Sequence, residues 1–252
     1  VFTESVETKW YTTTKKEEVA ISGFSYDKRW VLERKIKEYP EKHSRAKYHI
    51  GLLHGFSEGL ESEHGNYAPF SLGELRSKRY DYWALGHIHK RQQLAENPPV
   101  VYPGNTQGRS SKESGEKGFE IVTLTESGVL MEFRPTSTIQ WETIDLSIKE
   151  IKSLDELYKV LKAVVEEQKN DFYSLFLSIR LVDSENLLEE VLKKINQGEL
   201  LEALQQIPKT DTFVWLHKIE LQTVVENRIP AIQKIFSNVW EQIQKEIEKE
   251  SL

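Results

Sequence analysis

The pattern of hydrophobic and polar positions in the first part of the chain predicts short strands separated by loops. Segments rich in alternating or β-prone residues are bounded by Gly, Pro and turn residues, as strands commonly are. The expected strands are Val19–Tyr26, Tyr48–His54, Tyr80–Leu85, Val100–Tyr102, and a hairpin of Phe119–Leu124 with Val129–Phe133. Two helices are expected, Trp30–Tyr39, which stops before a proline, and Ser71–Lys78, which begins with the spacing of a capping box.

After Trp141 the pattern becomes mainly helical. Helical periodicity predicts helices at Leu154–Lys169, Asn186–Asn196 and Ile229–Ser251, and alternation predicts strands at Tyr173–Leu181 and Phe213–Leu221. We therefore expect a mixed α/β (α+β) chain with a domain boundary near residues 135–145. The expected domains are residues 1–140 and 141–252.

Charge is distributed unevenly along the 252 residues. Residues 1–140 carry 20 Lys and Arg against 19 Asp and Glu, whereas residues 141–252 carry 14 against 21, giving a net charge of −6. A chain that bound nucleic acid mainly through bulk charge would be basic, so that mode is disfavoured. Within Arg76–Lys117, however, eight cations accompany four acids. This local excess could face phosphates or could be an ordinary solvated surface.

Cysteine content and hydropathy exclude several classes of protein. The chain has no cysteine, so it has no disulfide scaffold and no thiolate metal site, which fits a cytoplasmic location. No apolar run approaches the ~18–20 residues that a membrane-spanning helix requires. The opening segment lacks the features of a signal peptide. Since Val1 is not a start residue and Met131 is the sole methionine, we expect the chain to be the C-terminal part of a longer protein.

Three histidines lie where strands are expected to end. His87 and His89 belong to the sequence Gly86-His87-Ile88-His89 after one strand, and His54 ends another strand before Gly55. Side chains at positions i and i+2 of an extended segment point to the same side. Imidazole suits Zn, Mn, Fe or Ni, although a two-metal site would also need carboxylates. The alternative is a set of partly exposed loop histidines.

Other polar residues give weaker indications. The loop with Asn105 and Arg109 is polar and could contact phosphate or could be a plain turn. Nucleotide-phosphate loop motifs are absent from the sequence. We interpret His43 and His49 as surface or edge residues, and His217 as a structural histidine.

Three segments together resemble a known family. HIGLLHG, YAPFSLGELRSKRYDYWALGHIHKRQ and PPVVYPGNTQGRSSKESGEKGFEIV are similar in order and motif to the SbcD-type DNA repair exonucleases of the calcineurin-like metallophosphoesterase superfamily. The resemblance covers about residues 19–135, and residues 141–252 resemble the family's capping domain more loosely. It implies part of a two-sheet α/β sandwich followed by a smaller α+β capping domain.

The resemblance also implies a chemistry. His54 and His87 would bind one divalent metal ion and His89 the other, with manganese the expected metal. The reaction would be hydrolysis of a DNA phosphodiester, in which the two ions stabilise the attacking and leaving oxygens. Apart from the resemblance, the charge of Arg91 and Arg109, the polarity of the Asn105 loop and their proximity to the histidines in sequence lead us to expect these three residues to contact phosphate.

The family's remaining metal ligands have no counterpart in this chain. None of the seven aspartates begins an Asp-x-His motif, no Gly-Asp pair occurs, and neither Gly-Asn pair precedes a histidine. The catalytic set is therefore incomplete. We expect the isolated chain to be inactive and to bind metal weakly or not at all.

A second class of function is a non-catalytic binding or assembly module. Apolar residues recur at helical spacing near the C-terminus, which indicates one apolar helix face. They are Ile232, Ile235, Phe236, Val239, Trp240, Ile243 and Ile247. This face could dock on its own domain or bind a partner, and the resemblance implies DNA, an SMC-like ATPase subunit and a second copy as partners. A barrel enzyme with a His-x-His strand is disfavoured because eight βα repeats are lacking.

Overall fold

The first part of the chain forms a six-stranded sheet. The computed structural model describes residues 1–26, 30–60, 67–184, 189–205 and 211–222. The strands are β1 (Glu7–Thr12), β2 (Glu18–Gly23), β3 (Tyr48–His54), β4 (Tyr82–Gly86), β5 (Gln92–Glu96) and β6 (Pro99–Tyr102). Their order is β1-β2-β3-β4-β6-β5. The four inner strands are parallel, and β1 and β5 are antiparallel to their neighbours, so the inner strands end at one common edge.

Aromatic packing fixes the register of the central strands. Trp83 of β4 is fully buried and stacks on Tyr80 with ring centroids 4.7 Å apart. Gly51 of β3 lies opposite Trp83 in the register. A Cβ atom at Gly51 would approach the Trp83 ring to 2.2 Å, so only glycine leaves room for the indole at this point.

His49 is buried in this sheet, so our interpretation of it as a surface or edge residue was wrong. Its Nδ1 accepts a hydrogen bond from the His43 backbone N–H at 3.3 Å, which leaves Nε2–H to donate to Ser22 Oγ at 2.7 Å. The ring stacks on Tyr80 with centroids 3.7 Å apart. The local alternation of YHIGLLH could not show this burial, because the partners come from other segments of the chain.

Two helical turns accompany the first sheet. The capping box that we predicted is present: Ser71 caps α1 (Leu72–Ser77), and Glu74 bonds back to the Ser71 backbone. The helix that we predicted at Trp30–Tyr39 is reduced to a 3-10 turn, η1 (Lys35–Glu38). The reason is that the Val31 carbonyl accepts a hydrogen bond from the Ala68 N–H instead of continuing a helix.

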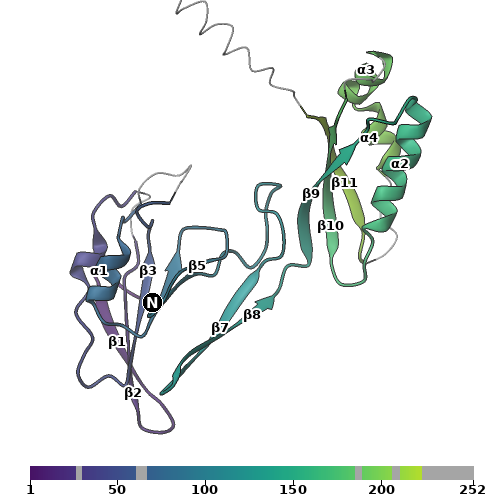
Figure 1. Cartoon of the computed structure of the whole chain (residues 1–252). Helices are drawn as coiled ribbons and strands as arrows, with labels where there is room; N and C mark the ends of the chain where they lie inside the picture. The colour runs from purple at the N-terminus through teal and green to yellow at the C-terminus, as the bar shows by residue number, and fades with distance from the viewer. Residues whose placement is uncertain (27–29, 61–66, 185–188, 206–210, 223–252) are drawn as a thin grey trace, which may run out of the picture.

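The second part of the chain is a smaller sheet with helices on one face. After the hairpin β7 (Gly118–Thr125) and β8 (Gly128–Pro135), three parallel strands follow in the order β11-β10-β9. Their bounds are Ile139–Ser147 for β9, Ser174–Val182 for β10 and Val214–Leu221 for β11, with helices α2 (Leu154–Glu167), α3 (Glu189–Gln197) and α4 (Glu199–Leu204). Figure 1 shows all three helices on one face of this sheet. This is the arrangement expected when successive parallel strands are added in one direction through crossovers of the usual right hand.

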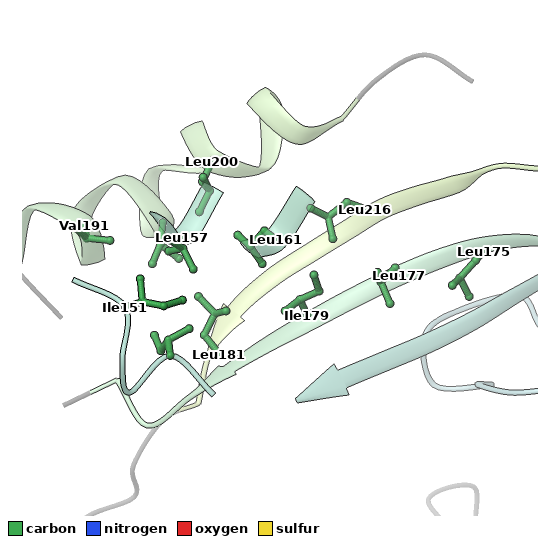
Figure 2. Close-up of a cluster of buried hydrophobic side chains, with 12 residues drawn as sticks. Ile151, Leu157, Leu161, Leu175, Leu177, Ile179, Leu181, Val191, Leu200 and Leu216 are labelled. Atoms are coloured by element: carbon green, nitrogen blue, oxygen red, sulfur yellow. The ribbon is translucent and has the colours of Figure 1, made fainter. Parts of the chain in front are cut away.

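The core of this second part lies between the sheet and its helices. Figure 2 shows Leu177, Ile179 and Leu181 of β10 on the same side as Leu157 and Leu161. All five side chains are almost completely buried. The buried clusters of the two parts share no residue. The domain boundary near residue 140 stays an interpretation compatible with this separation.

The mixed α/β fold class that the sequence predicted is confirmed. Strand β3 has the predicted bounds, and the predicted hairpin is present. Strands β1, β5 and β9 and helix α4 were not predicted. The predicted helix Ile229–Ser251, with Ile232, Phe236 and Trp240, lies outside the described residues. Within the described part of the chain, no helix is long and apolar enough to cross a membrane.

Candidate functional site

His54 and His87 lie side by side where two parallel strands end. His54 is the last residue of β3 and pairs in register with Gly86, the last residue of β4, and His87 follows directly. The two rings are edge to face with centroids 5.4 Å apart. A Cβ atom at Gly86 would come within 2.9 Å of His54 Nδ1, so glycine is what lets the His54 ring lie over the end of β4.

Aromatic side chains surround this pair. Buried Tyr67 stacks against His87 at 5.5 Å and meets the His54 ring edge to face at 5.3 Å. Buried Phe56 contacts His87 and exposed Tyr26 contacts His54. Burial, and secondly the charge of nearby His89, lower the pKa of His54. The His54 ring is therefore held in the neutral form, which is the form that binds metal ions.

The backbone of His87 is in a conformation that favours glycine. Its φ is +109°, which is rare for a residue with a side chain. Such a conformation costs of order 1–3 kcal/mol and persists only where surrounding contacts enforce it. One such contact is made by Gly55, the residue after β3, whose N–H donates to the carbonyl of Gly86, the residue before His87. Strain of this kind is concentrated at functional sites, so it supports a role for His87.

His89 is joined to the loop that follows β6. Its Nδ1 lies 2.7 Å from Glu113 Oε1. Glu113 Oε2 accepts the Arg109 backbone N–H at 2.9 Å. Burial raises the pKa of Glu113, but hydrogen bonds from Arg109, His89 and Asn105 outweigh it and hold the pKa below its usual range. Sequence reasoning missed Glu113, whose only signal was its place among the cations of a polar loop.

The predicted phosphate-contact residues lie in two different surroundings. Asn105 and Arg109 both approach Glu113 and therefore lie near His89. The Arg109 side chain is 71% exposed. Arg91 pairs with Glu120, and its guanidinium lies 4.5 Å from the centre of the Phe133 ring. Arg109 is thus the more accessible cation, while phosphate contact by all three residues stays a prediction.

The histidines fit one part of a divalent-metal site. Imidazole is a suitable ligand, His54 and His87 are in contact, and His89 lies near enough for its charge to lower the pKa of His54. Among the described residues, however, no group of three or more His, Cys, Asp or Glu side chains is placed to hold a metal ion. The residues described here therefore supply imidazole donors but do not complete a site.

Comparison with known proteins points in the same direction. No protein-family model matches the chain. The chain is 36% identical over 230 residues to YhaO of Bacillus subtilis (strain 168), an uncharacterized metallophosphoesterase. The match covers 90% of this chain and 55% of YhaO, so the chain spans about half the length of that relative. The similarity supports the metallophosphoesterase superfamily, the superfamily that the histidine motifs indicated.

Proposed function

We propose that this chain carries the histidine-bearing part of a metal-dependent phosphoesterase. The observation that carries the proposal is the juxtaposition of His54 and His87 at the ends of adjacent parallel strands. Ligands commonly bind beyond the carboxyl ends of parallel strands. The similarity to a metallophosphoesterase over 90% of the chain supports the same reading.

In this proposal His54 and His87 hold one divalent ion and His89 holds the other. Bound metal would polarise a phosphoryl oxygen and lower the pKa of a coordinated water. The carboxylate ligands would come from residues outside this chain. The chain's own contribution is to supply imidazole ligands, to limit water around them through Tyr67 and Phe56, and to offer Arg109 to the substrate phosphate.

A phosphodiester of DNA is the substrate that we favour. The SbcD-type motifs support it. The segment Arg76–Lys117 supports it too, because it contains eight cations and only four acids. The same motifs suggest manganese as the metal, DNA repair as the setting, and an SMC-like ATPase or a second copy of the chain as a partner. The lack of cysteine fits a cytoplasmic location.

Hydrolysis assays on the complete gene product and on the 252-residue chain test this function. We expect the complete protein to cleave a small phosphodiester and end-labelled linear DNA with Mn²⁺, and chelator to abolish both activities. The variant His87→Ala should lose at least about 100-fold in rate, because it removes a metal ligand. His43→Ala removes an exposed imidazole of the same sheet region and is the matched control.

The outcomes separate the parts of the proposal. Cleavage of the small diester without cleavage of DNA would keep the phosphoesterase and reject the nuclease. Full activity of His87→Ala would reject the histidine site itself. Robust, chelator-sensitive activity of the 252-residue chain alone would show that it needs no ligands from elsewhere.

A further inference from the structure

The contact between Glu113 and His89 has the geometry of an orienting hydrogen bond. The Nδ1–Oε1 distance is 2.7 Å, and the Glu113 side chain is only 14% exposed against 43% for His89. An ionised carboxylate is only an acceptor, so the proton lies on His89 Nδ1. A neutral imidazole that donates through Nδ1 keeps its lone pair on Nε2. The contact thus selects one tautomer and one ring orientation.

Glu113 is itself held in place by its own loop. The Arg109 backbone N–H donates to Glu113 Oε2 at 2.9 Å, and the Glu113 backbone N–H donates to the Ser110 carbonyl. The loop is also tied to the histidine segment, because the Asn105 N–H donates to the His89 carbonyl at 3.3 Å. The carboxylate therefore has little freedom to leave the ring.

The same loop is anchored on β9, the first strand of the second sheet. The Gln107 side chain donates to the Ile139 carbonyl at 2.6 Å. The Trp141 indole N–H donates to the Gly108 carbonyl at 3.2 Å, and the Gly115 N–H donates to the Trp141 carbonyl at 2.9 Å. These bonds fall on both sides of Glu113 in the sequence, so β9 supports the segment that carries the carboxylate.

We infer that Glu113 is a positioning residue for His89, and that β9 supports it through the loop of residues 103–117. Its carboxylate holds the Nδ1–H tautomer and leaves Nε2 directed to a ligand. The identity of that ligand as a divalent metal ion rests on the proposed function, whereas the orientation of the ring does not. Carboxylates that accept the second N–H of a ligating histidine commonly play this part.

The orientation can be tested on the 252-residue chain without metal. Nitrogen-15 NMR of the histidine rings near pH 8 reports which nitrogen of His89 carries the proton. We expect the Nδ1–H form in the unmodified chain and a change of about tenfold in the tautomer ratio toward Nε2–H in Glu113→Ala, because a hydrogen bond to a charged group is lost. Glu116→Ala, which removes an exposed acid of the same loop, should leave the ratio unchanged.

Two further variants distinguish positioning from simple loop stability. Glu113→Gln keeps an acceptor without the charge, so it should shift the ratio less than Glu113→Ala. Trp141→Phe removes the indole N–H that supports the loop and should shift the ratio in the same direction, while Trp215→Phe on β11 should not. An unchanged His89 tautomer in both Glu113 variants, with the backbone spectrum intact, would overturn the inference.

Titration of the complete gene product with Mn²⁺ connects the inference to the proposed function. Broadening of the histidine ring signals gives the affinity, and Glu113→Ala should lower it about 10- to 100-fold. If the tautomer shifts as expected but no version binds Mn²⁺, the positioning role stands and the metal function fails. If Mn²⁺ binds equally to both versions and the tautomer does not change, the positioning role fails and the metal function stands.

Discussion

Lowering the pH from 7 to 5 is expected to destabilise the six-stranded sheet by about 2 kcal/mol through His49. Desolvation in the native sheet, and then the charges of His43 and Lys42, lower its pKa from 6.5 to about 4, with Asp81 acting in the opposite direction. Between these two values the unfolded chain binds a proton that the native sheet does not bind. The contribution of His49 to the free energy of unfolding is therefore fully present above about pH 6.5. It falls as the pH drops toward 4, by about 3 kcal/mol in total.

The geometry explains why the native sheet resists this proton. The His49 side chain is fully buried, and its Nδ1 already accepts the His43 backbone N–H. Protonation would turn that acceptor into a donor facing another donor. The stacked Tyr80 ring gives no acceptor in exchange, and Asp81 is already bound by Lys42 and by the His49 backbone N–H.

Urea unfolding at several pH values between 7 and 4.5 measures the effect. The signal would be fluorine-19 NMR of 5-fluorotryptophan at Trp83, which is fully buried in the same sheet. The variant His49→Gln cannot titrate, so its stability should change with pH about 2 kcal/mol less than that of the unmodified chain. Working above pH 4.5 keeps most carboxylates ionised. Equal pH dependence of the two proteins would refute the reasoning.

Two substitutions test the packing and capping of the same sheet region by thermal unfolding. Gly51→Ala should destabilise the folded chain by about 3 kcal/mol, because its Cβ would overlap the buried Trp83 ring at 2.2 Å. Gly73→Ala is the control and should cost no stability, because its Cβ would meet no atom closer than 3.9 Å. Ser71→Ala should cost about 1 kcal/mol by removing the cap that Glu74 N–H uses, and Ser77→Ala in the same helix should cost less. Equal effects within either pair would contradict the corresponding contact.

The local pattern placed His54 and His87 each at the end of a strand, and the family resemblance implied that the two belong to one metal site. A strand that ends in histidine and a second strand followed by Gly-His bring their ends together whenever the strands are parallel neighbours. His54 and His87 lie in contact for that reason. The capping box at Ser71 and Glu74 was equally visible, since both partners lie within one turn.

Glu113 and His49 could not be predicted because their partners are distant in sequence. Glu113 reaches His89 only because its loop folds back onto β9, a strand that the pattern did not predict. The alternating pattern predicted a polar, exposed position for His49. Its burial depends instead on contacts with Ser22 and Tyr80 from other segments. Local periodicity carries no information about either set of contacts.

The strained backbone of His87 affects which substitutions position 87 accepts when the site is no longer under selection. At a φ of +109° glycine would avoid a steric cost that histidine bears, and this cost offsets the packing of the imidazole against Tyr67 and Phe56. In a library of variants selected only for folded protein, position 87 should gain glycine, while position 51 should resist every replacement. In homologous proteins that no longer need the site, we expect the histidine at position 87 to be lost first, because its backbone is strained.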